Sequence, residues 1–303
     1  MSSPDKLEIG TVSRTFFVVP IWAAIEHGFF REQGLEVKLG IFGNASQVEP
    51  LVSGSMHIAL ASPEVILQNT AQGGPLRFIA GNARKLSHFL IAQPKFKRVE
   101  DLRGATIGIL NMLEGTFFQL KDIMARHGLH YPEDYKVKDT GGVPPRHKAL
   151  LEGSIDAGLQ SIPWSYLEED AGFSNLADAS DYVPEWQFTT FNASRDWAAK
   201  NPDVVVRFLR AMLKSTAWML QNRAGSAALV AREMDMALSH AERGWDYYTG
   251  RGVLAPDLAL SSAGLTQVIA AQVKAGLLGA QAADNIQAYI EPAYLEEARR
   301  TST

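Results

Sequence analysis

The residues best suited to chemistry lie in short polar segments that directly follow apolar, strand-like segments. The first such segment is the loop from Thr11 to Phe17, at the end of an apolar strand that begins at Leu7. It supplies hydroxyls, a guanidinium and a ring at Thr11, Ser13, Arg14 and Phe16. A guanidinium can bind an anion through two parallel hydrogen bonds, and a ring can enclose an apolar part of a ligand. Open α/β sheets bind ligands at such strand-to-helix loops. We therefore predict a ligand-binding loop here; the alternative is a solvated loop with Phe16 in the core.

Further candidates stand at predicted helix starts, in glycine turns or near a crossing between lobes. They are Ser62, Glu64, Asn111, Glu114, Gly115, Thr116, Gly142, Gln160, Trp164 and Trp186. Free N–H groups at a helix start can hold a ligand oxygen, and glycine lets a ligand approach the backbone. Each has a structural alternative: Ser62 can cap its own helix, Glu114 can complement the helix dipole, and Trp164 can fill the core.

The sequence lacks the common catalytic and metal-binding motifs. The seven histidines are scattered, and HExxH, GxSxG, GxxxxGK[ST] and GxGxxG do not occur. His57 alternates within a predicted strand, which favours a structural role. We therefore expect no catalytic residues, no metal site and no cofactor.

Composition narrows the class of protein. Of the 303 residues, 46% are hydrophobic and 20% charged, which is typical of a soluble globular protein. The net charge of −4 and the absence of basic clusters argue against a nucleic-acid partner. No apolar run of about 18 residues occurs, so direct membrane insertion is not expected. The absence of cysteine excludes disulfides and thiolate chemistry.

The order of predicted elements indicates two α/β lobes. Strands and helices alternate from Leu7 to about Ala80, which predicts a mostly parallel sheet flanked by helices. The plan recurs later, because the helix-to-strand step LVSGSMHIAL has a second copy, LLEGSIDAGL. Trp186–Asn192 is predicted to be the strand that returns to the first lobe. We expect lobe 1 to comprise residues 1–88 and 190–303, and lobe 2 residues 89–189.

Two crossings between lobes predict a hinge. They lie near Leu86–Gln93 and Val183–Asn192, and hinges are short segments that absorb backbone rotation. We expect a monomer that binds its ligand in a cleft between the lobes.

Several segments, in order, resemble one family. Ile25–Val37, IEHGFFREQGLEV, looks like the opening of type II periplasmic solute-binding proteins of ABC importers. The similar group binds nitrate, alkanesulfonates, taurine and thiamine pyrimidine precursors. The other matching segments are Leu51–Leu60, Pro75–Gly81, Val99–Ile109 and Lys148–Leu159.

The resemblance implies a substrate-binding component of an ABC-type importer, with permease subunits as partners. Its ligand would be a small organic molecule, anionic or heteroaromatic: a sulfonate, a carboxylate or a pyrimidine. The resemblance also implies a periplasmic or extracytoplasmic location. The segment MSSPDKLEIG has no signal-peptide pattern, so a cytoplasmic location is the alternative.

The rival function is a cytoplasmic enzyme on the same fold, such as a metal-independent decarboxylase or isomerase of a small aromatic or carboxylic acid. Such an enzyme would use Arg14, His57 or Glu114. The thiamine-pyrimidine synthases resemble these binding proteins, but their cysteine-rich iron segment has no counterpart here because the chain has no cysteine.

Overall fold

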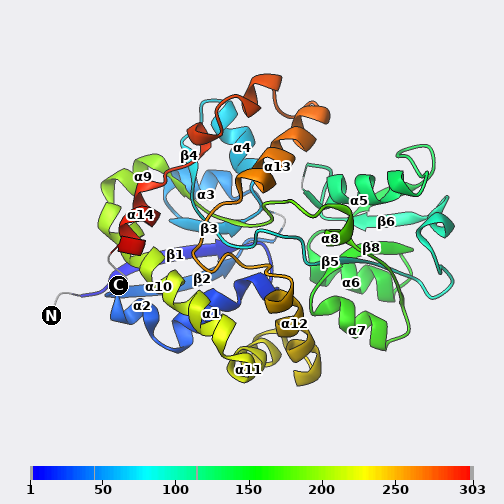
Figure 1. Ribbon diagram of the computed structural model, residues 1–303, viewed down its shortest axis with the longest axis horizontal. Helices are drawn as coiled ribbons and strands as arrows, with labels where there is room; N and C mark the ends of the chain where they lie inside the picture. Colours follow the sequence, from blue (N-terminus) through cyan, green and yellow to red (C-terminus); the bar gives the residue numbers. More distant parts are fainter. Residues whose placement is uncertain (1–2, 44, 114, 301–303) are drawn as a thin grey trace. The chain divides into compact units, whose positions relative to one another are not determined.

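The protein folds as two compact units (Figure 1). The computed structural model describes residues 3–43, 45–113 and 115–300. Unit 1 comprises Met1–Arg84 and Trp186–Thr303, and unit 2 comprises Lys85–Glu185. Unit 1 is therefore built from two separate stretches of sequence, whereas unit 2 is continuous.

The sheet of unit 1 has five strands in the order β2-β1-β3-β10-β4. They are β1 (Asp5–Thr11), β2 (Leu35–Ile41), β3 (Ile58–Ala61), β4 (Leu76–Gly81) and β10 (Thr190–Ser194). β1 pairs in parallel with β2 and β3, whereas β10 runs antiparallel to β3 and β4. Because the chain first moves from β1 to β2 and then returns to the other side of β1, the topological switch point lies between β1 and β3.

The sheet of unit 2 repeats this plan in the order β7-β6-β8-β5-β9. Its strands are β5 (His88–Ala92), β6 (Thr106–Ile109), β7 (Lys136–Asp139), β8 (Ala157–Ser161) and β9 (Ser174–Asp178). β6 pairs in parallel with β7 and β8, and β5 runs antiparallel to β8 and β9. The switch point of this unit therefore lies between β6 and β8.

Helices cover the sheet of unit 1. The N-terminal segment supplies η1 (Phe16–Val18), α1 (Val19–Glu26), α2 (Phe29–Glu32), α3 (Val48–Ser53) and α4 (Glu64–Ala71). The C-terminal segment supplies α9 (Arg195–Lys200), α10 (Pro202–Gln221), α11 (Arg223–Met234), α12 (Leu238–Gly250), α13 (Ser262–Lys274), η3 (Ala280–Ala283), η4 (Ile286–Tyr289) and α14 (Ala293–Arg300). α10 lies along α1 and α2 and also packs against α14, while α13 packs against α4 (Figure 1).

The burial pattern of α10 shows why this helix packs as it does. Its buried residues Val205, Phe208, Leu209 and Met212 follow the i, i+3, i+4, i+7 spacing of one helix face. Phe208 stacks on Phe30 of α2, with ring centroids 5.8 Å apart. This face thus anchors the C-terminal segment on the N-terminal one.

Unit 2 has fewer helices. They are η2 (Val99–Leu102), α5 (Gly115–Arg126), α6 (Val143–Leu151), α7 (Trp164–Asp170) and α8 (Ala179–Tyr182). α6 packs against α7, and α5 packs against α8. The chain moves from β6 to β7 in one direction along the sheet and from β7 to β8 in the other. Right-handed crossovers therefore place α5 and α6 on opposite faces of the sheet.

The repeated helix-to-strand step is present in both units. Gly54 ends α3 with φ 78°, and Gly153 follows α6 with φ 69°. Glycine adopts this left-handed conformation at little cost, which suits it to end a helix. In each unit a strand begins four residues later, at Ile58 or at Ala157. The shared sequence step therefore encodes a shared turn.

One predicted element is wrong in its position. The strand predicted at Trp186–Asn192 begins only at Thr190 and ends at Ser194. All four preceding residues are buried, and apolar Trp186 and Phe188, 2% and 8% exposed, alternate with polar Gln187 and Thr189. The sequence pattern alone therefore does not separate this core loop from a strand. None of the described helices is both long and apolar enough to cross a membrane.

Candidate functional site

Two buried threonine hydroxyls lie in the strand-to-helix loop of unit 1. Thr11 is the last residue of β1, and Thr15 immediately precedes η1. Each is 1% exposed, and neither Oγ1 has a hydrogen-bond partner among the described residues. Buried polar groups in native proteins are nearly always hydrogen-bonded, so these two hydroxyls are candidates for contact with a ligand.

A hydrogen-bonded network lies at the neighbouring strand end. The Thr190 hydroxyl donates to Asn192 Oδ1 at 2.7 Å, and Asn192 Nδ2 donates to Gln47 Oε1 at 3.5 Å. All three side chains are buried. Thr190 pairs with Ala61, the last residue of β3, so this network fixes the strand end from which the predicted Ser62 and Glu64 loop departs.

Ser62 and Glu64 occupy the loop and first turn that follow β3. Ser62 is partly buried, and Glu64 is the first residue of α4 and fully buried. A carboxylate at this end of a helix interacts favourably with the helix dipole. Glu64 therefore has a structural role available in addition to the ligand contact predicted for it.

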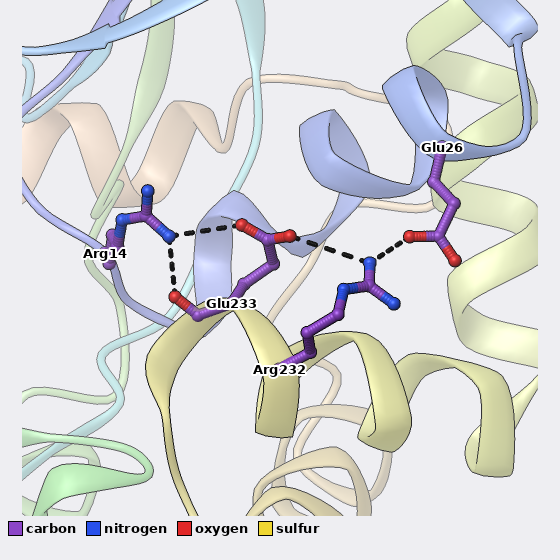
Figure 2. Close-up of polar contacts among 4 residues, drawn as sticks. All are labelled: Arg14, Glu26, Arg232 and Glu233. Carbon is purple, nitrogen blue, oxygen red and sulfur yellow. Dashed lines mark hydrogen bonds and ion pairs between the residues drawn. The ribbon is translucent and has the colours of Figure 1, made fainter.

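Arg14, the predicted anion partner, is directed toward α11 (Figure 2). Its Nη1 donates to the Glu233 carbonyl at 2.7 Å and to Glu233 Oε2 at 3.1 Å. Arg232 contacts Glu233 and also pairs with Glu26 of α1. The Arg14 side chain is 52% exposed, so this is a surface ion-pair network. The structure thus shows an intramolecular partner for the guanidinium.

Three other predicted residues of unit 1 are buried. Phe16 is fully buried, with its ring centroid 4.6 Å from that of Tyr248 in α12. Ser13 is 7% exposed and Trp186 is 2% exposed. The alternative of Phe16 as a core residue, considered from the sequence, matches its position.

In unit 2 the predicted residues lie at the carboxyl ends of β6, β7 and β8. Asn111 Oδ1 accepts a hydrogen bond from the Leu113 N–H at 2.8 Å, which closes a local turn. Gly115 and Thr116 open α5, and the buried Thr116 Oγ1 has no described partner. Gly142 immediately precedes α6. Glu114, also a predicted site residue, lies outside the described residues.

Gln160 and Trp164 hold buried polar atoms without described partners. Gln160, near the end of β8, is fully buried, and both of its amide atoms lack a hydrogen bond. The Nε1 of Trp164, at the start of α7, is also buried and unpaired. The Trp164 ring lies 5.0 Å from that of His147. Two donors, Gln160 Nε2 and Trp164 Nε1, and one acceptor, Gln160 Oε1, therefore lie beside the switch point of unit 2 without described partners.

The same region contains Arg146, a buried cation that was not among the predicted site residues. Arg146 belongs to α6 and is 1% exposed. Its stem passes over two strand glycines: Cγ lies 3.2 Å from the ideal Cβ position of Gly108, and Cδ lies 2.9 Å from that of Gly158. Its Nη1 donates to the Gly141 carbonyl at 3.2 Å. Burial lowers the pKa of Arg146 to about 10, so the guanidinium stays charged at neutral pH.

Two further ionisable groups surround this cation. Glu168 of α7 is fully buried, and its Oε1 lies 2.7 Å from His147 Nδ1. Burial raises the pKa of Glu168, while His147 and Arg146 oppose the rise. Burial and the nearby Arg146 lower the pKa of His88 to about 3, so His88 is neutral at pH 7. Arg146 therefore carries a positive charge at neutral pH, whereas His88 does not.

A sequence signal for Arg146 did exist. Gly108 and Gly158 interrupt two neighbouring apolar strands, TIGI and AGLQS. A glycine inside a strand often marks the close approach of another group, here an arginine stem. The signal does not say which side chain approaches. No group of three or more acidic or histidine side chains in the described part of the chain could hold a metal ion.

Comparison with known proteins decides the family. Residues 16–225, more than half of the chain, match the profile of the family described as "NMT1/THI5 like". The chain belongs to the NMT1/THI5-like family. The resemblance expected from the sequence is thus confirmed.

Individual relatives are distant. YtlA of Bacillus subtilis is 25% identical over 222 residues, which cover 71% of this chain and 66% of YtlA. The formylaminopyrimidine-binding protein of Halalkalibacterium halodurans is 26% identical over 210 residues, which cover 67% of this chain and 62% of the relative. The matched region of this NMT1/THI5-like chain therefore spans slightly less than two thirds of each relative.

Solved structures support the fold. The alkanesulfonate-binding protein SsuA of Xanthomonas axonopodis pv. citri, bound to MOPS, has a TM-score of 0.72 to this chain at 21% identity, and the match covers 98% of this chain and 99% of SsuA. The predicted α/β class and the periplasmic binding-protein fold are confirmed for this NMT1/THI5-like protein.

Proposed function

We propose that this protein is the substrate-binding component of an ABC-type importer. The observation that carries the proposal is that both units follow one doubly wound plan, and that in each unit buried polar atoms without partners lie at the strand ends beside the switch point. Ligands of open α/β sheets bind at such strand ends. Family membership and the fold of the solved neighbours support the same role.

The ligand in this proposal is a small organic molecule. The names of similar proteins cover a formylaminopyrimidine and alkanesulfonates, that is, a heteroaromatic and an anionic class. In unit 1, Thr11 and Thr15 offer hydroxyls, which suit either class. In unit 2, Gln160 and Trp164 offer an amide and an indole N–H. The partners would be permease subunits, and the protein would act outside the cytoplasm.

Binding without turnover tests the proposal. The pure protein is first analysed by native mass spectrometry for a co-purified molecule. It is then titrated calorimetrically with methanesulfonate, benzoate and formylaminopyrimidine. Saturable binding at one molecule per chain, with the ligand recovered unchanged, is the expected result. Steady conversion of a bound compound would instead support the enzyme alternative and overturn the transport role.

A further inference from the structure

Arg146 is a buried cation with most of its hydrogen-bonding capacity unused. A guanidinium has five N–H donors in a fixed fork. The hydrogen bond described for Arg146 is the one from Nη1 to the Gly141 carbonyl, and Nε is buried without a partner among the described residues. A buried charge is costly unless it is paired and hydrogen-bonded. The Nε–Nη2 edge therefore needs an acceptor.

The geometry of the sheet brings polar donors to the same place. Residues i and i+2 of a strand face the same side of a sheet, so Gln160 shares the face on which the Arg146 stem covers Gly158. The guanidinium reaches Gly141, in the loop after β7, and Gln160 lies near the end of β8. Both side chains thus lie at the carboxyl edge of the unit 2 sheet.

The neighbouring charged groups leave the Arg146 guanidinium available to an acceptor from outside the described residues. The Glu168 carboxyl raises the pKa of Arg146, but its Oε1 is held by His147 at 2.7 Å and its Oε2 has no hydrogen-bond partner among the described residues. No ion pair within 4.0 Å joins Arg146 to a carboxylate of the described residues. His88 adds no positive charge at neutral pH, since burial keeps its pKa low. The site consequently carries one strong cation without a direct counter-ion.

We propose that the Nε–Nη2 edge of Arg146 binds the oxyanion group of the ligand, with Gln160 as a second donor. The fork of a guanidinium matches two oxygens of one oxyanion, whether carboxylate, sulfonate or nitrate. This inference rests on the proposed binding function and narrows its ligand from two classes to the anionic one. Arg146 would then determine specificity in place of Arg14, whose guanidinium is paired with Glu233.

The test compares Arg146→Met and Arg146→Lys with the parent protein. Both replacements keep an unbranched stem over Gly108 and Gly158, and circular dichroism first verifies that each variant is folded. Methanesulfonate, benzoate and nitrate serve as probes in calorimetric titrations. Loss of a charge-assisted hydrogen bond should weaken binding roughly 10- to 100-fold in Arg146→Met, and Arg146→Lys should recover only part of it. Arg103→Met, at an exposed arginine of unit 2, is the control and should bind as the parent does.

A measurement on the parent keeps the proposal testable if both variants misfold. The Nε–Hε NMR signal of Arg146 should shift as a bound probe is titrated in. Parent-like affinity in Arg146→Met, or an unmoved signal at saturation, would overturn the role of Arg146 while leaving the binding function intact. Binding of formylaminopyrimidine with no binding of any oxyanion would likewise overturn this inference but support the importer role. Turnover of a probe would overturn the proposed function itself.

Discussion

The side chain of Arg146 occupies the space that a side chain on Gly158 would need. Its Cδ lies 2.9 Å from the ideal Cβ position of that glycine, which is closer than real Cβ contacts come. Position 158 therefore accepts only glycine without strain as long as the Arg146 stem lies over the strand.

Gly158→Ala should destabilise the protein and displace Arg146. Overpacking by a methyl group costs about 1–3 kcal/mol of the free energy of unfolding. Urea denaturation measures this cost. Gly40→Ala is the matched control, because Gly40 also lies in a strand and its nearest contact would be an ordinary 3.8 Å. Equal stabilities of the two variants would show that Arg146 moves aside at no cost.

Thr11→Val and Thr15→Val should weaken ligand binding without lowering stability. Each replacement removes a buried hydroxyl that has no described partner, so little is lost on folding. Thr190→Val is the contrast, since that hydroxyl donates to Asn192 at 2.7 Å and its loss should cost about 1–3 kcal/mol. Thermal unfolding measures the change in stability, and titration with a ligand that the parent protein binds measures the change in affinity. Unchanged affinity in both Thr11 and Thr15 variants would remove this loop from the site.

The Arg14–Glu233 pair should contribute little to stability. With 52% and 28% of the two side chains exposed, a double-mutant cycle of Arg14→Ala and Glu233→Ala should give a coupling free energy of about 0.2–1 kcal/mol. The value should fall at 1 M salt, where the Debye length is about 3 Å. The hydrogen bond to the Glu233 carbonyl cancels in this cycle, because Glu233→Ala keeps that carbonyl. A coupling that salt leaves unchanged would therefore contradict an ion pair as its source.

His88 should make the protein acid-sensitive. Its pKa is lowered from 6.5 to about 3 in the folded state, so below pH 6.5 the unfolded chain takes up a proton that the folded chain does not. Stability should therefore fall with decreasing pH between about 6.5 and 3, by up to about 1.4 kcal/mol per pH unit. Urea unfolding at pH 7, 6, 5 and 4 measures the slope.

His88→Asn should flatten this slope. His130→Asn, at an exposed histidine of the same unit, is the control and should retain the parent's slope. A slope that survives in His88→Asn would assign the acid sensitivity to other groups.

The sequence predicts the order of strands along the chain well, because alternation of apolar strands and helices is a local pattern. The two glycine steps at Gly54 and Gly153 have the turn that the repeated sequence encodes. The antiparallel insertion of β10 between β3 and β4 depends on pairing across more than 100 residues, which no local pattern records. The predicted lobe boundaries and the hinge stay predictions.

The candidate site was less predictable than the fold. Residue type indicated Gln160 and Trp164, and both hold buried unpaired atoms. The sequence favours Arg14 because it is a cation in the first strand-to-helix loop. Its structural partner Glu233 lies 219 residues away in the chain, so no local pattern indicates the pair. The sequence does not indicate Arg146, because arginines on helices are usually solvated and the space for its stem is left by two glycines on strands β6 and β8.

The insertion of β10 between β3 and β4 also sets the order in which the chain can fold during its synthesis. When the ribosome has made residues up to Glu185, every strand of unit 2 is available, but the sheet of unit 1 still lacks the strand that joins β3 to β4. The sheet of unit 1 therefore stays incomplete, with β4 unpaired, until β10 has been synthesised. Exposed strand edges of this kind are prone to aggregation, so unit 1 is the part of a nascent chain that a chaperone would need to protect.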